Sequence, residues 1–311
     1  MQRQMSEPIT KKKAGSAMNM QRFRRFLALP TSGLLLALLL AGCDATNPDD
    51  LEVTDSTVNE DVAASVATLV ADASGGMLDQ VGDLAELTSA SGLWAAGKDG
   101  VERVYDEATG TWTVTVDRER SNPPGTVQMS VHRVYTVQFL NAEGLPQKYY
   151  ITEGDTARTL NFQIVEGSGT FQTPRVTAER TDISGGFVAT NIHTEQVTLN
   201  GDYSRSGTHR IETNAVNRVL EYSFSVQVFD LVGPRGSRLN LAQKVSGVLE
   251  GQFTGTLTLE NPAGSRVVNI SRDVRVEIAD GVMTIYINGE RYVADPSTAD
   301  GTFHSPPEVG G

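Results

Sequence analysis

The chain of 311 residues carries 26 Lys and Arg residues against 38 Asp and Glu residues, which gives a formal net charge of −12 at pH 7. A surface of this sign repels the phosphates of nucleic acids and of anionic lipid headgroups, so no nucleic-acid partner is expected. The sequence contains a single cysteine, which excludes a disulfide bond within the chain.

The first element of the chain has the pattern of a secretion signal. Arg22, Arg24 and Arg25 precede a stretch without charge that runs from Phe26 to Cys43. A basic segment followed by an apolar one is typical of signal peptides. The uncharged stretch is marginal in length for a membrane span, and Pro-Thr-Ser at 30–32 shortens its strongly apolar part. A transmembrane anchor is therefore the less favoured interpretation.

The end of this stretch, Leu40-Ala41-Gly42-Cys43, resembles the lipobox of bacterial lipoproteins. The resemblance covers only the signal region. It implies that the Cys43 thiol receives a diacylglyceryl group, and that a lipoprotein signal peptidase cuts between Gly42 and Cys43, after which the new amino terminus can be acylated. The protein is then expected in the cell envelope, held on a membrane through lipidated Cys43. The alternative is an ordinary cysteine in a cleaved signal or a span. Met1, Met18 and Met20 all remain possible translation starts.

An acidic tether is predicted for residues 43–60. Residues 1–42 hold 7 basic and 1 acidic residues, so the cleaved chain keeps 19 basic and 37 acidic residues and a net charge of −18. Like charges extend a linker, which favours a solvated spacer. A sorting signal is the alternative, because Asp44 resembles the retention signal of enteric inner-membrane lipoproteins and Asp49-Asp50 resembles a surface-export signal. The choice of membrane stays open. Residues 44–61 carry seven acids and no base: Asp44, Asp49, Asp50, Glu52, Asp55, Glu60 and Asp61.

Two short helices are predicted within residues 61–90. Thr57 and Glu60 have the spacing of a capping box at the start of the first helix. Apolar residues then recur at helical spacing up to Gly75-Gly76, and again from Leu78 to about Leu87. Each helix is expected to have one apolar stripe, and such short helices are marginal alone in water. The sheet that follows is the simplest surface for them to cover.

Residues 91–294 are predicted to form an antiparallel β domain, and residues 295–311 a flexible tail. From Val101 the apolar period changes to 2, with Thr, Ser, Gln, Asn, Glu and Arg on the opposite face, as in an antiparallel sheet with one wet side. Arg133 is an exception on the apolar face. The apolar positions are Trp112, Val114 and Val116; Val127, Met129, Val131, Tyr135, Val137 and Phe139; Leu160, Phe162 and Ile164; Tyr222, Phe224, Val226 and Val228; Leu249, Phe253, Leu257 and Leu259; and Val268, Ile270, Val274, Val276 and Ile278.

The turn residues predict about ten to twelve strands joined by hairpins in up-and-down order. Asp280-Gly281 and Asn288-Gly289 suit two-residue turns, and residues 261–264 suit a four-residue turn. A further turn lies at Asn200-Gly201 or at Ser206-Gly207. Gly201, Gly251 and Gly255 are alternatively the marks of bulges. The predicted fold class is mainly β: a large curved antiparallel sheet, either an open barrel or a sandwich, with a short N-terminal helical pair.

The sequence does not point to a catalytic, cofactor or metal site. The histidines His132, His193, His209 and His304 are interpreted as surface residues, although Glu195 and Glu212 lie near two of them. Nucleophile and zinc motifs such as Gly-x-Ser-x-Gly and His-Glu-x-x-His are absent, and Gly-Ser-Gly at 167–169 is interpreted as a turn. Glu195, Asp202 and Glu212 are candidate carboxylates only because they are near one another in sequence.

Two non-catalytic functions from different classes remain, with a carboxylate-based hydrolase as a weaker third. The first is a binding protein for an apolar small molecule or lipid, because more than twenty apolar residues on one sheet face exceed what two short helices can cover. That layout is similar, by analogy of fold, to periplasmic lipoprotein carriers and mycobacterial lipid-binding lipoproteins, which have open barrels. The second is a structural or adhesive envelope protein with a filled core.

Overall fold

The computed structural model describes residues 53–89, 98–212, 216–236, 238–262, 264–299 and 301–302. The predicted lipidation and cleavage sites, Gly42 and Cys43, lie outside these residues, as does His304. The helices are α1 (Asp55–Val70) and α2 (Met77–Leu87), with a 3-10 turn, η2 (Leu241–Gln243). Neither described α-helix is long and apolar enough to cross a membrane.

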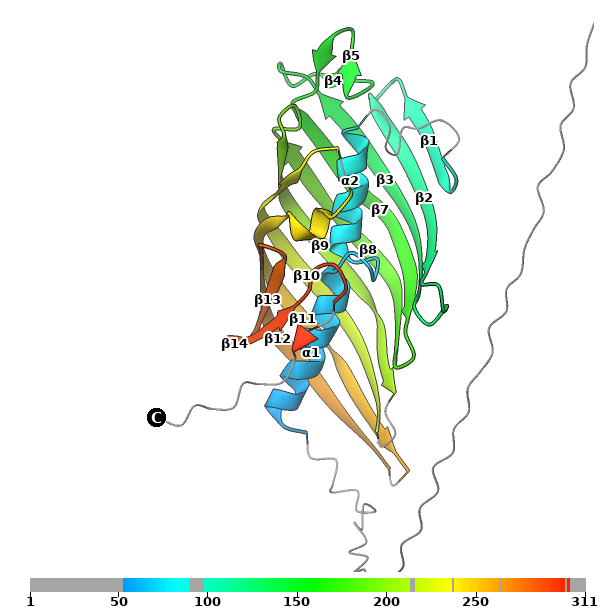
Figure 1. The fold of residues 1–311 in the computed structure, drawn as a ribbon, viewed down its shortest axis with the longest axis vertical. Coiled ribbons are helices and arrows are strands. Elements are labelled where there is room, and N and C mark those ends of the chain that lie inside the picture. Colours follow the sequence, from blue (N-terminus) through cyan, green and yellow to red (C-terminus); the bar gives the residue numbers. More distant parts are fainter. Residues whose placement is uncertain are drawn as a thin grey trace, which may run out of the picture. The chain divides into compact units, whose positions relative to one another are not determined.

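One antiparallel sheet forms most of the molecule, and its strands follow each other in the order of the chain (Figure 1). The path runs β1-β2-β3-β7-β8-β9-β10-β11-β12-β13-β14-β15, while β4 pairs with β3 and the pair β5-β6 stands apart. The bounds are β1 (Val101–Asp106), β2 (Thr111–Ser121), β3 (Gln128–Leu140), β4 (Pro146–Gln147), β5 (Ile151–Thr152), β6 (Asp155–Thr156), β7 (Thr159–Gln172), β8 (Val176–Thr190), β9 (Gln196–Glu212), β10 (Asn217–Pro234), β11 (Ser246–Asn261), β12 (Gly264–Ala279), β13 (Val282–Ile287), β14 (Glu290–Ala294) and β15 (Gly301–Thr302).

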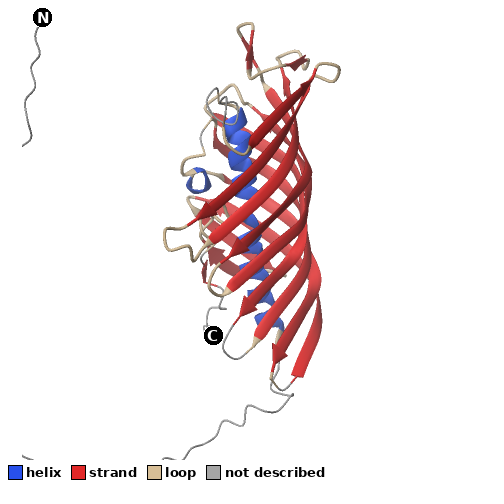
Figure 2. Cartoon of the chain, turned by 90° about the vertical axis from the view of Figure 1, so that its right-hand side faces the viewer, coloured by secondary structure: helices blue, strands red, loops and turns tan. Residues whose placement is uncertain are grey.

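The predicted fold class is confirmed, and the open curved sheet is the correct alternative rather than the sandwich. Figure 2 shows the tilted strands curving around the helices, which lie on the hollow side. The two ends of the strand path, β1 and β15, do not pair with each other in the described part of the chain. The side of the sheet that faces the helices, which carries Val114, Tyr135 and Phe224, is called the hollow face below.

The period-2 pattern places the predicted apolar residues on the hollow face. In β3, every second residue from Met129 to Phe139 is buried, and its neighbours on the strand are at most partly buried. Arg133 follows the same alternation and is fully buried. Val127 and Val268 are only partly buried, at the margins of this face. The period therefore predicted the direction of each side chain correctly, including that of the charged exception.

The helices begin earlier and are more deeply buried than expected. Thr54, not Thr57, caps α1: the Thr54 hydroxyl accepts a hydrogen bond of 3.2 Å from the backbone N–H of Thr57. Residues 55–60, assigned to the tether, therefore belong to the helix. The predicted break at Gly75-Gly76 and the end at Leu87 are confirmed. In α2 every residue except Glu86 is buried, because the sheet curves around the helix instead of meeting one stripe of it.

Two of the turns predicted from glycine residues are confirmed, whereas the other candidate turns lie inside strands. Positive φ angles at Asp280-Gly281 and Asn288-Gly289 confirm those two hairpin turns. Residues 200–201 and 206–207 are not turns but lie inside β9, and residues 167–169 lie inside β7. Gly251 and Gly255 are not bulges, since the register of β11 with β10 is continuous there. A Cβ atom on Gly251 would lie 1.9 Å from the carbonyl oxygen of Ser225, so the strands approach too closely for a side chain.

The start of the predicted tail is ordered against the helices. The backbone N–H groups of Asp72 and Ala73 donate to the carbonyls of Pro296 and Ser297 at 3.0 and 2.8 Å. Beyond this segment, β15 adds to the edge of β14. The link between the helices is thus fixed by the end of the chain, and residues 295–299 belong to the folded body.

Candidate functional site

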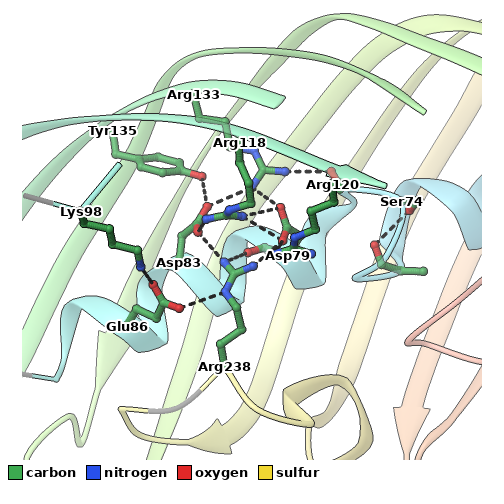
Figure 3. A network of polar contacts seen from close by, with 12 residues as sticks. Ser74, Asp79, Asp83, Glu86, Lys98, Arg118, Arg120, Arg133, Tyr135 and Arg238 are labelled. Atoms are coloured by element: carbon green, nitrogen blue, oxygen red, sulfur yellow. Dashed lines mark hydrogen bonds and ion pairs between the residues drawn. The ribbon is translucent and has the colours of Figure 1, made fainter. Parts of the chain in front are cut away.

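Charged side chains of the hollow face converge on two aspartates of α2. Asp79 and Asp83 are four residues apart, so they share one side of the helix, and both are completely buried. Figure 3 shows the side chains of Arg118, Arg120, Arg133 and Arg238 pointing at them. The arginine–aspartate network defined by these contacts consists of Asp79, Asp83, Arg118 and Arg120 from β2, Arg133 from β3, and Arg238 from the segment that follows β10.

Each aspartate receives hydrogen bonds from several guanidinium groups. Arg118 donates to both oxygens of Asp79 at 3.0 and 3.1 Å, and to Asp83. Arg133 bridges the pair through one nitrogen, at 2.7 Å from Asp79 and 2.9 Å from Asp83. Arg238 also bonds both carboxylates. The Tyr135 hydroxyl donates to Asp83 at 2.8 Å. The carboxylate oxygens are therefore saturated with donors.

The packing of Arg238 depends on the glycine between the aspartates. A Cβ atom at Gly82 would lie 2.9 Å from the guanidinium carbon of Arg238, so the missing side chain lets the guanidinium lie against the helix. Arg238 also approaches Glu86 at 3.4 Å, and Glu86 pairs with Lys98 at 2.5 Å. Gly82 weakens α2 by its helix propensity, and this contact explains its presence there.

The arginines keep both aspartates ionised. Burial alone would raise the pKa of Asp79, but the charges of Arg133, Arg238, Arg118 and Arg120 outweigh it and lower the pKa below its ordinary value. Burial likewise opposes Arg238 and Arg118 at Asp83, and the net pKa is lowered. Burial raises the pKa of Tyr135 well above its usual range, so the hydroxyl stays protonated and acts as the hydrogen-bond donor to Asp83. Carboxylates in this state hold no proton for acid catalysis, and their lone pairs are already used.

Further arginines along the hollow face bind α1 in the same way. Arg218 of β10 pairs with Asp61 at 2.7 Å, and Arg272 of β12 pairs with Asp55 at 2.9 Å. Arg272 also donates a hydrogen bond of 2.6 Å to the side-chain oxygen of Asn59. Asn59 donates to Glu290 at 2.9 Å. Acids that were interpreted as parts of a solvated tether are therefore partners of the sheet. The helix pair is fixed at both ends by ion pairs with strands far away in the sequence.

Two arginines of the hollow face bind backbone carbonyls instead. Arg180 of β8 donates to the carbonyls of Ser74 and Thr68, the latter at 3.4 Å, and Arg205 of β9 donates to that of Gly75 at 3.1 Å. These carbonyls lie at the C-terminal end of α1 and just beyond it, where the helix dipole favours positive charge. Burial and the charge of Arg205 lower the pKa of Arg180 to about 9. No carboxylate in the described residues forms an ion pair with either arginine.

The histidines divide into exposed and buried ones. His193 is exposed as predicted, although it lies in the turn before β9 and not on a strand. His132 is partly exposed and bonds Asp117 across the β2–β3 pair at 2.7 Å. The surface interpretation is wrong for His209, which is buried on the hollow face and bonds the Ser65 hydroxyl at 2.6 Å. Burial, followed by the charge of Arg180, lowers the pKa of His209 to about 4.

The carboxylates suspected from sequence proximity do not come together. Glu195, Asp202 and Glu212 are all exposed. Asp202 and Glu212 are ten residues apart on β9, which separates them by about 33 Å. Within the described ranges, no group of three or more His, Cys, Asp or Glu side chains is placed to hold a metal ion.

The network was not predicted, although two signals for it were present. Arg133 broke the apolar pattern of its strand, and Asp79 and Asp83 stood four apart in a helix with Gly82 between them. A charged residue on a core-facing position needs a buried partner, and acids at this spacing are such a partner. Comparison with family models, curated proteins and solved structures finds no match for this chain.

The network predicts a large effect of Asp83→Asn on stability. The substitution removes a charge that Arg118, Arg133 and Arg238 share, and should lower the free energy of unfolding by about 3–5 kcal/mol, measured by urea denaturation. A carboxylate with a lowered pKa stabilises the fold above its unfolded pKa of about 4 and loses this effect as pH falls through the folded value. The variant should therefore lose less stability than the parent on acidification below about pH 4.

A matched control for this substitution is Glu250→Gln. Glu250 pairs with Arg275 on the exposed side of the sheet, where the ion pair is solvated. This control should change the free energy of unfolding by less than about 1 kcal/mol. Equal effects of the two substitutions would show that the buried network does not hold the helices.

Proposed function

We propose that the chain is a non-catalytic, lipid-anchored protein of the bacterial cell envelope that acts through its outer surface, in a structural or adhesive role. The observation that carries the proposal is the filling of the hollow face by the chain's own helices. The apolar residues of the inner strands are buried beneath α1 and α2, and the helices are fixed there by ion pairs. A core occupied in this way leaves the outside for contacts.

The outer surface offers features for such contacts. Near the β4–β6 end of the molecule, Leu145, Tyr149 and Ile151 are 61%, 46% and 57% exposed, an unusual density of large apolar side chains on an acidic protein. Tyr149 packs beside Trp112 with the ring centroids 5.6 Å apart, so this segment is packed against the strands of the sheet. A groove lined by both polar and apolar residues, among them Gln138, Asp202 and Val188, lies on the other side of the sheet from the helices.

The second candidate is a carrier of an apolar ligand, in which the helices give way to a lipid. The observation in its favour is the lining that the helices cover, which is apolar over most strands. The helices themselves contain buried polar residues, including Asn59, Asp61 and Gln80, so much of their attachment is polar. A hydrolase that uses carboxylates has less support, because Asp79 and Asp83 are saturated by arginines.

The anchor is tested by Cys43→Ala in the producing bacterium. The lipobox Leu40-Ala41-Gly42-Cys43 predicts that the parent is cleaved before Cys43 and acylated on its thiol. Each buried CH₂ of an acyl chain contributes about 0.8 kcal/mol, so two or three chains retain a protein on the membrane. The variant should appear uncleaved or in the soluble fraction. Mass spectrometry of the mature amino terminus checks this, and an unmodified terminus elsewhere would contradict the anchor.

The choice between the two candidates is tested on the soluble domain that lacks residues 1–43. Native mass spectrometry after gentle extraction should show the bare chain, and an apolar fluorescent probe should not brighten, because the helices occupy the hollow face. A fatty-acid-binding protein handled in parallel serves as the positive control. Lipid of defined stoichiometry on the domain would contradict the filled core and support the carrier.

A further inference from the structure

Four polar side chains surround Gly207 on the hollow face, beside the arginine–aspartate network, since Arg205 and Arg133 both donate to the carbonyl of Gly75. Gly207 of β9 pairs with Arg180 of β8 on one side and with Tyr222 of β10 on the other. Arg205 and His209 lie two residues before and after it on β9, so they point to the same face. Directly opposed residues of antiparallel strands have Cβ atoms about 5 Å apart. These four side chains are called the Gly207 cage.

Gly207 lets the backbone of β8 and the side chain of Tyr222 approach β9 closely. A Cβ atom there would lie 2.1 Å from the carbonyl oxygen of Glu179, 3.0 Å from the hydroxyl oxygen of Tyr222 and 3.1 Å from the Cα atom of Arg180. The hydroxyl of Tyr222 therefore leans over the glycine. The side chains of the cage are closed off from solvent, with exposed fractions of 1% for Arg180 and Arg205, 3% for His209 and 6% for Tyr222.

Every member of the cage has a buried polar atom without a hydrogen-bond partner among the described residues. These atoms are Nε of Arg180, Nε and Nη1 of Arg205, Nε2 of His209 and the hydroxyl of Tyr222. Buried polar atoms in native proteins are nearly always paired, and an unpaired one indicates a bound water or ion. Five such atoms around one glycine indicate a shared ligand.

The charge of the cage decides what that ligand is. Arg180 and Arg205 bond only carbonyl oxygens, whereas Arg133 on the same face has two carboxylates. Two buried guanidinium groups without a counter-charge are costly. The unpaired arginine atoms can only donate, the tyrosine can donate, and His209 offers its Nε2 proton when Nδ1 accepts from Ser65. A single water accepts only two hydrogen bonds and must donate two, so it fits this set of donors poorly.

We propose that the Gly207 cage binds a small monovalent anion of the halide type, such as chloride, between Arg180, Arg205, His209 and Tyr222. The anion compensates the arginine charges beside the C-terminal end of α1. Because Arg180 and Arg205 hold the carbonyls of Ser74 and Gly75, the bound anion stabilises the link between the helices against the sheet. The site is independent of the outer surface on which the proposed function rests.

The test is thermal unfolding of the soluble domain in mixtures of sodium chloride and sodium gluconate at constant ionic strength. Gluconate is too large for the closed cage, so the melting temperature should rise saturably with chloride, as for any ligand that binds only the folded state. Tyr222→Phe removes one donor and keeps the ring that stacks on Phe253. It should raise the half-saturating chloride concentration about fivefold, the effect of one lost hydrogen bond. Tyr286→Phe on β13 makes the same chemical change elsewhere and should leave the chloride response unchanged.

Two further measurements make the test decisive. Arg205→Met should abolish the saturable rise of the melting temperature with chloride. If Arg205→Met does not fold, the comparison of the parent with Tyr222→Phe decides the test. Crystals of the parent grown with sodium bromide should give an anomalous peak over Gly207. In crystals of Tyr222→Phe this peak should be weaker or absent. Equal melting temperatures of the parent in chloride and gluconate, or bromide peaks only on the outer surface, would overturn the proposal.

Discussion

The contact between the arginines of the hollow face and the helix pair is the interaction on which the structure depends. Helices of 16 and 11 residues are marginal alone in water, and α2 buries Asp79 and Asp83 completely. Burying two carboxylates against the apolar hollow face is too costly without groups of opposite charge. Burying the arginines there is likewise costly without hydrogen-bond acceptors. Helices and sheet therefore require each other.

This dependence explains how the sheet stays open. A sheet with one apolar face must cover that face, and a second sheet or closure would do so. Here α1 and α2 lie along the hollow face, and residues 238–245 and 295–299 add to the cover. Glycines sit where backbones or guanidinium groups come closest, as at Gly75, Gly82 and Gly207. The interior is thereby filled by side chains that hold the helices against the sheet.

The sequence predicted what depends on neighbours along the chain. The period of 2 gave the buried face of each strand, and Asp280-Gly281 and Asn288-Gly289 indicated two hairpins, because both signals are local. The same dipeptide at Asn200-Gly201 lies inside β9. The ion pairs join residues far apart, such as Arg272 with Asp55 and Arg133 with Asp79, and no local pattern reveals such a partner. The same acids consequently resembled a solvated tether. His209 resembled a surface residue for the same reason, since its partner Ser65 lies in α1.

The most direct measurement of the central claim is amide hydrogen exchange on the soluble domain, followed by mass spectrometry. If the arginine contacts join helices and sheet into one cooperative unit, then peptides from α1 and α2 exchange only through global unfolding, as slowly as peptides from β9 and β10. Helices that exchange many times faster while those strands stay protected would contradict the account, because they would show that the helices leave the hollow face without the sheet.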